Sequence, residues 1–286
     1  MSGGKETIMK YADIVILSGQ SNAVGVGHLK CLSKHFSEDK IKEYYDGYEK
    51  IQINYYSHDK RGQGFGKTTV SCTEIHKQTL GPEVGMAEYF NENYPGKEIF
   101  IIKCAFGGAN LANDWLSKSS GAPYSYEETK NCAINKPGRM AGWCYNELIK
   151  ILGDSIEELK SRGYTPRIKA FCWMQGESDA FSIPTLEAYI ERYDNLLKDI
   201  KSEFGEYMAD CRYLDAAISE RWTYASRMNE IKREYAQSHR NCVYIDTVAA
   251  GLTTENEPFD EPDVAHYDSD CTITLGKLFA EQVVFD

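Results

Sequence analysis

The stretch VILSGQSNAVG, residues 15–25, decides how this chain is interpreted. An apolar run typical of a buried strand breaks abruptly into Gly19, Gln20, Ser21 and Asn22, and small residues follow. Glycine permits a sharp turn at this point. Two explanations of the serine follow from its position: Ser21 caps a short helix, or the turn presents its hydroxyl for chemistry.

Four further short apolar runs resemble the first one. Each is nearly continuously apolar, as expected for parallel strands that are buried on both faces. Stretches with apolar residues at helical spacing lie between them, and this alternation predicts an α/β protein with a doubly wound parallel sheet. The expected strands are residues 14–17, 99–104, 168–173, 212–218 and 242–245, and the expected helices are residues 83–93, 140–162, 186–204, 224–238 and 272–284.

Two stretches do not follow this alternation. Residues 26–80 are polar and rich in Tyr, Lys and Gly, with one expected strand at residues 51–56, and residues 111–136 resemble a second long loop. Insertions of this length usually form lids or binding loops. No repeat, low-complexity tract or Pro-rich linker divides the 286 residues, so we expect residues 1–286 to form a single domain.

The composition narrows the classes of partner. The net charge of −11 without a basic patch argues against nucleic acid, and no apolar stretch approaches the roughly 20 residues that a membrane helix needs. The nine cysteines include no C-x-x-C pair and are too scattered for a structural zinc site, which suits a reducing compartment. We therefore expect a cytoplasmic protein without metal or cofactor; its oligomeric state is not indicated.

Polar residues collect where the expected strands end. In open α/β sheets, sites form outside the carboxyl ends of the strands. The first strand ends at Ser21, and the later segments are KCAFGGANLANDW (residues 103–115), FCWMQGESDA (residues 171–180) and EPDVAHYDSD (residues 261–270). A serine, a glycine pair, a Gln-Gly-Glu and an Asp-x-x-His are the parts that a serine esterase requires.

The chemistry explains these residue types. A serine hydroxyl is a poor nucleophile at neutral pH and needs an adjacent base, for which the imidazole of His266 is suited. A carboxylate such as Asp263 then orients the ring and stabilises the imidazolium as it forms. Backbone N–H groups and a side-chain amide must face the oxyanion of the tetrahedral intermediate, and Gly107 and Gly108 allow backbone donors to approach a ligand closely.

Each of these parts also has a purely structural explanation. Ser21 and Asp263 could cap helices, the glycine pair could form a plain turn, and His266 could be a surface or core histidine. Gln175 and Glu177 could be polar strand-end residues, and Trp115 and Trp173 could belong to the core. Taken together these structural explanations are less convincing, because all four segments follow the carboxyl ends of expected strands, where a site would form.

Together the four segments resemble the SGNH hydrolase superfamily and, within it, the sialate O-acetylesterase-like carbohydrate acetylesterases. The similar motifs are G-Q-S-N at 19–22, G-G-x-x-L-x-x-x-W at 107–115, W-x-Q-G-E-S-D at 173–179 and D-x-x-H at 263–266, with LGPEVGMAEYF at 80–90 similar to the family's Gly-Pro helix start. The turn at Ser21 is not the G-x-S-x-G of α/β-hydrolases, since Ala23 stands at the last position.

The resemblance implies a flavodoxin-like three-layer α/β/α fold and metal-independent ester hydrolysis. By position, Ser21 would be the nucleophile, His266 the base and Asp263 the residue that orients it. The oxyanion hole would use the N–H groups of Ser21 and Gly108 with the amide of Gln175. Two alternatives stay open: Asn110 as the amide donor, and Glu177 as the acid or as a positioning residue.

The expected function is therefore that of a serine esterase that removes O-acetyl groups from carbohydrate, either sialic acid or an acetylated glycan, through an acetyl-enzyme on Ser21. Gln20, Asn22 and Trp115 are the expected substrate contacts. Two other functions fit the same residues: a short-chain acyl esterase that acts on a non-sugar ester, and a non-catalytic carbohydrate-binding protein on the same fold.

Overall fold

Buried parallel strands form the centre of the fold. The computed structural model describes residues 9–71, 78–132, 138–259 and 261–285. Within them the main sheet runs in the order β10-β9-β8-β1-β7-β3-β4, and β5 also pairs with β3. The strands from β10 to β3 are parallel, whereas β4 and β5 are antiparallel to β3. The strands are β1 (Lys10–Gly19), β3 (Tyr48–Ser57), β4 (Lys60–Arg61), β5 (Gly66–Thr68), β7 (Ile99–Ala105), β8 (Tyr164–Met174), β9 (Arg212–Ala216) and β10 (Cys242–Ile245).

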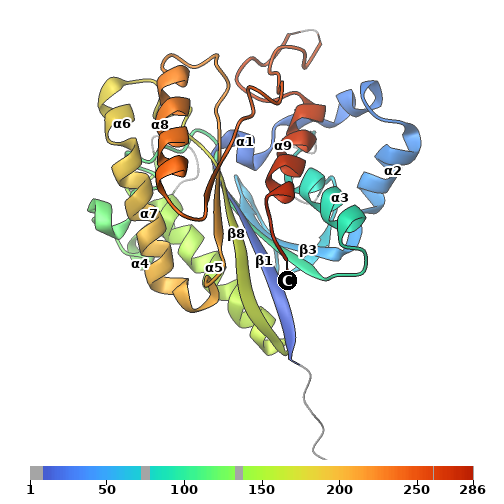
Figure 1. Ribbon diagram of the computed structural model, residues 1–286, viewed down its shortest axis with the longest axis horizontal. Helices are drawn as coiled ribbons and strands as arrows, with labels where there is room; N and C mark the ends of the chain where they lie inside the picture. The colour runs from blue at the N-terminus through green and yellow to red at the C-terminus, as the bar shows by residue number, and fades with distance from the viewer. Residues whose placement is uncertain (1–8, 72–77, 133–137, 260, 286) are drawn as a thin grey trace, which may run out of the picture.

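Helices cover both faces of this sheet and give three layers (Figure 1). Helices α5, α7 and α8 lie on one side, and α2, α3 and α9 lie on the other. The apolar stripe of α5, which includes Leu148, Leu152 and Leu159, is fully buried toward the sheet. The three-layer α/β/α fold implied by the motifs is therefore confirmed. These helices are α2 (Glu38–Asp46), α3 (Glu83–Asn93), α5 (Trp143–Ser161), α7 (Tyr189–Phe204), α8 (Ala225–Ser238) and α9 (Ser269–Glu281).

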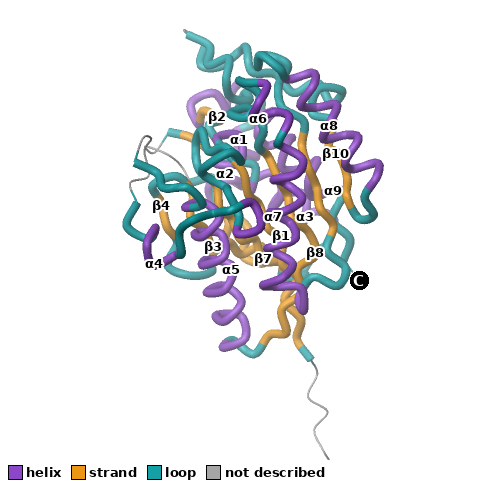
Figure 2. Tube along the Cα trace, turned by 90° about the vertical axis from the view of Figure 1, so that its left-hand side faces the viewer, coloured by secondary structure: helices purple, strands orange, loops and turns teal. Residues whose placement is uncertain are grey.

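The carboxyl ends of the parallel strands meet at one edge of the molecule. In Figure 1 the chain enters β1 at the bottom and leaves it at the top, beside α1. Figure 2 shows α5 and α7 in front of the strands, with loops gathered above them at the same end. The short elements are α1 (Ser21–Val24), β2 (Gly27–His28), η1 (Leu29–Lys34), β6 (Thr79–Leu80), η2 (Lys118–Ser120), α4 (Tyr126–Thr129), α6 (Ile183–Glu187) and η3 (Gly205–Tyr207).

Residues 26–80 are more regular than their composition predicts. The expected strand at residues 51–56 is confirmed as part of β3, which pairs with β7 inside the main sheet. Helix α2 was not predicted, because only Tyr44 of its nine residues is buried and the rest is mostly charged. The 111–136 stretch likewise holds η2 and α4, and its last residues fall in the part of the chain outside the described ranges.

The single helix expected at residues 186–204 is two helices in the structure. The chain forms α6 after Ser182, whose side chain caps it with Pro184 in the first turn. It then makes a turn at Ala188 and continues as α7. Apolar residues at helical spacing run on through this junction, so periodicity alone did not reveal the break.

The cysteines of the described residues form no disulfide. Cys104, Cys172 and Cys211 are buried in strands or beside them, and Cys242 is partly exposed. These thiols therefore fill the core as small apolar side chains. In the same ranges, no helix combines the length and apolarity needed to cross a bilayer.

Candidate active site

The turn that carries Ser21 is built on a position that only glycine can occupy. Gly19 ends β1 with φ +140°, and a Cβ atom there would lie 2.0 Å from the carbonyl oxygen of Met174 in β8. The next N–H, that of Gln20, donates to the same oxygen at 2.9 Å. Helix α1 begins directly afterwards, so Ser21 is its first residue. The residue before the helix is Gln20, and its side chain makes no capping bond, so Ser21 is not a helix cap.

A buried ion pair anchors the far end of α1. The ammonium group of Lys103 donates to the carbonyl oxygen of Val24 at 2.7 Å and to the carboxylate of Glu83 at 2.5 Å. The side chains of Lys103 and Glu83 are fully buried. Removing one charge would leave the other unpaired in the interior, which is costly, so the pair holds the short helix in a fixed orientation.

The histidine segment carries a hydrogen-bonded Asp–His pair. His266 Nδ1 lies 2.6 Å from Asp263 Oδ2. Burial opposes ionisation of Asp263, but the hydrogen bond and charge of His266 outweigh it and lower the pKa of that carboxyl below its usual value. The N–H of Asp263 also donates to the carbonyl oxygen of Glu257 at 2.8 Å. The carboxylate is therefore charged at neutral pH and fixes the ring through Nδ1, which leaves Nε2 for another partner.

The side chain of Asn22 joins the serine turn to the histidine segment and to the third motif segment. Asn22 Nδ2 donates to Glu177 Oε1 at 2.8 Å, and Asn22 Oδ1 accepts from the N–H of Tyr267 at 3.1 Å. Asn22 follows Ser21 in the chain, and Tyr267 follows His266. The contact therefore brings the serine and histidine segments side by side, although 245 positions separate the bonded residues.

Of the two carboxylates considered from the sequence, Asp263 is the one bonded to the histidine. Glu177 is fully buried and holds Asn22 instead. Burial raises the pKa of the Glu177 carboxyl, although the hydrogen bond from Asn22 partly offsets this. Glu177 therefore holds the side chain of Asn22, the residue that follows Ser21.

Of the glycine pair after β7, Gly108 faces open space, whereas Gly107 lies against the ring of His58. Gly108 has φ +63°, and a Cβ atom added there would meet nothing within 4 Å. Close by, Asn110 Oδ1 accepts the N–H of Asn113 at 2.7 Å, and the N–H of Asn110 donates to Asp114 Oδ2 at 3.0 Å. The amide oxygen of Asn110 is therefore committed to this turn.

The amide of Gln175, which the motif predicts as an oxyanion donor, makes hydrogen bonds inside the protein. Its Nε2 donates to Gln20 Oε1, to the carbonyl oxygen of Ala109 and to Asp179 Oδ2, at 3.2, 3.2 and 2.7 Å. The residue has no exposed surface. An amide with three internal acceptors has no N–H left for a substrate, so Gln175 ties the first three motif segments together.

Asp179 has a role that sequence reasoning did not assign. It accepts the N–H groups of Leu111 and Ala112 at 2.9 and 3.2 Å, together with the amide of Gln175. Burial raises the pKa of Asp179 to about 6, against the opposing effect of these donors. In the sequence, only its position as the last residue of the W-x-Q-G-E-S-D motif pointed to such a role. Its bonds link the third motif segment to the second.

The expected substrate contacts are also corrected. The Trp115 ring is fully buried and packs edge-on against Trp173 at 5.2 Å between centroids, so it belongs to the core. Gln20 and Asn22 are 2% and 3% exposed. Gln20 Oε1 accepts from Gln175 and from the N–H of Ser178, so both amides hold the site together and offer little surface to a substrate.

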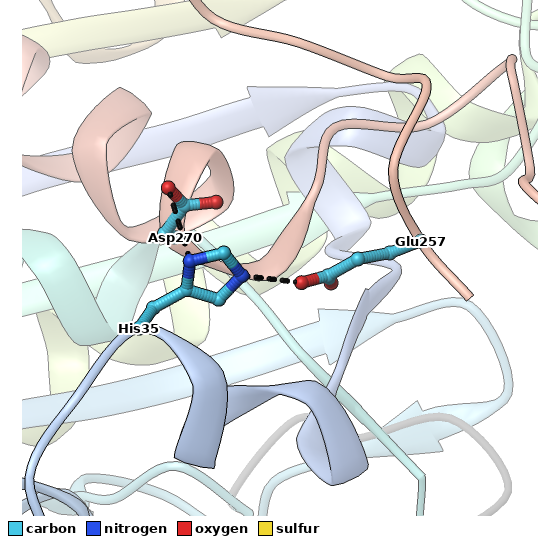
Figure 3. Close-up of side chains that lie close together, drawn as sticks. All are labelled: His35, Glu257 and Asp270. Carbon is cyan, nitrogen blue, oxygen red and sulfur yellow. Dashed lines mark hydrogen bonds and ion pairs between the residues drawn. The ribbon is translucent and has the colours of Figure 1, made fainter. Parts of the chain in front are cut away.

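One group of side chains has metal-ligand chemistry among the residues that the structure describes. His35, Glu257 and Asp270 lie close together (Figure 3). Glu257 Oε1 lies 2.7 Å from His35 Nε2, and Asp270 Oδ2 lies 3.6 Å from Nδ1. The ring is hydrogen-bonded to Glu257, which also accepts from the N–H of Ser269 at 2.8 Å.

Known proteins share this fold and these motifs. A family model described as "Carbohydrate esterase, sialic acid-specific acetylesterase" matches residues 11–285. A protein from Arabidopsis thaliana is 20% identical, with a TM-score of 0.63 over 95% of this chain and 97% of its own. NanS is 15% identical, with a TM-score of 0.67 over 96% of each chain. A search of curated protein sequences gives no match. The extent of the family match shows that this chain belongs to the carbohydrate esterases of the sialic acid-specific acetylesterase family.

Proposed function

We propose that the protein is a serine esterase that removes O-acetyl groups from a carbohydrate through an acetyl-enzyme on Ser21. The hydrogen-bond chain from Glu177 through Asn22 to Tyr267 carries this proposal, because it brings the serine turn beside the Asp263–His266 pair. Membership in a carbohydrate esterase family supports the same chemistry.

In this mechanism His266 acts as base and then as acid. Its Nε2 takes the proton of Ser21 Oγ while Oγ bonds to the acetyl carbonyl carbon, and the carbonyl π electrons move onto oxygen. When the oxyanion collapses, the bond to the sugar oxygen breaks and the imidazolium returns the proton to that oxygen. Water then attacks the acetyl-enzyme with the same assistance and releases acetate and free Ser21.

The oxyanion would receive N–H groups from three residues on two segments. Ser21 is the first residue of α1, so its N–H has no acceptor within the helix. The N–H of Gly108 and the Nδ2 group of Asn110 come from the turn after β7. Asn110 takes the place that Gln175 has in the sequence-based assignment, because the amide of Gln175 is used inside the protein.

Replacing Asn110 with alanine is expected to lower kcat by about 100-fold with little change in KM, because the lost donor acts mainly on the developing oxyanion. Steady-state kinetics with p-nitrophenyl acetate measure this. The matched control is Asn113→Ala, which removes a neighbouring exposed amide and keeps the backbone N–H that bonds Asn110. An Asn110→Ala protein that is folded and retains more than half of the wild-type kcat would remove Asn110 from the oxyanion hole.

A polar cavity beside the histidine segment supports a sugar as the leaving group. The cavity has a volume of about 240 Å³ and is lined by Ser219, Arg221, Thr254, Glu255 and Tyr267, among others. Charged and hydroxyl side chains at this density can bond sugar hydroxyls. These loops follow β9 and β10 and lie outside the stretches at residues 26–80 and 111–136, which were expected to form lids or binding loops.

The substrate class is tested by acetate release from acetylated monosaccharides and oligosaccharides, sialic acid and xylan fragments included. We expect kcat/KM for at least one of these sugars to exceed that for p-nitrophenyl acetate, since only a sugar can use the polar cavity. Activity that is confined to simple esters, and that is equal for butyrate and octanoate, would favour an acyl esterase on non-sugar esters. Sugar binding without hydrolysis would favour a binding protein.

A further inference from the structure

Arg139 lies against the glycine turn, and neither the motifs nor the mechanism accounts for it. Its guanidinium Nη2 donates to the carbonyl oxygen of Gly107 at 3.0 Å. Only 3% of its side chain is exposed, and its Cζ atom lies 5.7 Å from the centre of the Trp143 ring. A buried cation at this position costs desolvation energy, so its placement beside one particular carbonyl oxygen requires an explanation.

The carbonyl that Arg139 holds belongs to the same peptide unit as the N–H of Gly108. In a trans peptide the C=O and the following N–H point in opposite directions. A donor fixed on the Gly107 carbonyl oxygen therefore also fixes the direction of the Gly108 N–H, which points away from the opposite side of the C–N bond in the same plane. This matters most between two glycines, because their backbones lack the restraint that a Cβ atom provides.

The ion-pair partner of Arg139 holds the second donor segment. Asp114 Oδ2 lies 3.7 Å from Arg139 Nη1 and accepts the N–H of Asn110 at 3.0 Å. Asp114 is 1% exposed. The N–H of Asp114 also approaches Asn110 Oδ1, at 3.4 Å, which helps to turn the amide of that residue. One buried ion pair thus contacts both parts of the turn after β7 that supply oxyanion donors.

We propose that Arg139, paired with Asp114, is the positioning residue of the oxyanion hole: it orients the Gly107–Gly108 peptide so that the Gly108 N–H faces the reacting carbonyl oxygen. This inference rests on the proposed function. Arg139 touches neither the substrate nor Ser21 in this role. Its charge also polarises the peptide and strengthens the N–H as a donor toward a developing anion.

The test compares Arg139→Met and Arg139→Lys with wild type on p-nitrophenyl acetate. We expect kcat to fall by about 50-fold for methionine and about 5-fold for lysine, which keeps the charge but not the planar fork, with KM within about 3-fold. The inhibition constant of methylboronic acid, whose serine adduct carries an anionic oxygen in the same place, should rise in parallel with the loss of kcat. Arg227→Met, in an exposed pair with Glu230, is the control and should keep the wild-type rate.

The outcomes separate this inference from the proposed function. If wild type hydrolyses acetyl esters and folded Arg139→Met keeps its kcat and its boronate affinity, the positioning role is wrong and the esterase assignment stands. If wild type shows no esterase activity, the proposed function itself fails. If Arg139→Met does not fold, the lysine variant decides, since a lysine protein with unchanged kcat and boronate affinity would also overturn the positioning role.

Discussion

Replacement of Ser21 with alanine is expected to lower kcat/KM for acetyl ester hydrolysis by about 10⁴-fold or more, because no acetyl-enzyme can form without the hydroxyl. The folded structure should be unaffected. Ser21 is not the cap of α1, and that helix is held by Gly19 and by the Lys103 contact to Val24. Hydrolysis of p-nitrophenyl acetate and thermal unfolding, measured on the same preparations, check both statements.

The control for this variant is Ser178→Ala. Ser178 is a partly exposed serine in the third motif segment, and its backbone N–H, which bonds Gln20, survives the substitution. We expect its kcat/KM to stay within a few-fold of wild type. If Ser178→Ala loses most of its activity while Ser21→Ala stays active, the nucleophile would be Ser178, which contradicts the mechanism.

The second large loss of activity is expected when Asp263, the carboxylate that orients His266, is replaced. Asp263→Asn should lower kcat by about 10³- to 10⁴-fold, because an asparagine amide cannot hold the tautomer with the proton on Nδ1 or stabilise the imidazolium. Glu177→Gln should lower kcat far less, since a glutamine oxygen can still accept from Asn22 Nδ2. Comparison of the two variants at saturating substrate measures the difference, and equal losses would show that the histidine depends on both carboxylates.

The lowered pKa of Asp263 also fixes the direction of a pH effect. A carboxyl whose folded pKa lies below its unfolded value stabilises the folded protein above the unfolded pKa, and this contribution disappears as the pH falls through the folded value. The Asp–His pair therefore stays intact through neutral pH and is lost only under acidic conditions. Thermal unfolding followed from neutral to acidic pH measures this loss of stability.

The layered fold could be predicted because its strands are buried on both faces. The nearly continuous apolar run at residues 99–104 matches β7, which is buried throughout, and the run at residues 242–245 matches β10, an edge strand that is only partly buried. Helix α2 could not be predicted, since nearly all of its stability comes from one buried face at Tyr44 and from a cap at Ser37. A polar helix of this length carries little periodic signal.

The candidate site was predictable as a set of segments and not as a set of contacts. Motif order placed the serine, glycine, glutamine and histidine segments at one edge of the sheet, where the structure also has them. The direction of an amide cannot be read from spacing, so the internal bonds of Gln175 were missed. The same holds for Arg139, which contacts the site through a carbonyl oxygen 32 positions away and through Asp114. Trp115 failed as a substrate contact because motif position says nothing about burial.

Modification by a fluorophosphonate tests the central claim most directly, because this reagent phosphonylates only a serine that an adjacent base has activated. Protein inactivated by the reagent is digested, and the modified peptide is identified by mass spectrometry, with a His266→Ala protein treated in parallel. The account predicts a single adduct on Ser21 that forms in step with the loss of esterase activity and does not form without His266. Inactivation that leaves Ser21 unmodified, or that follows an adduct on another residue, would contradict it.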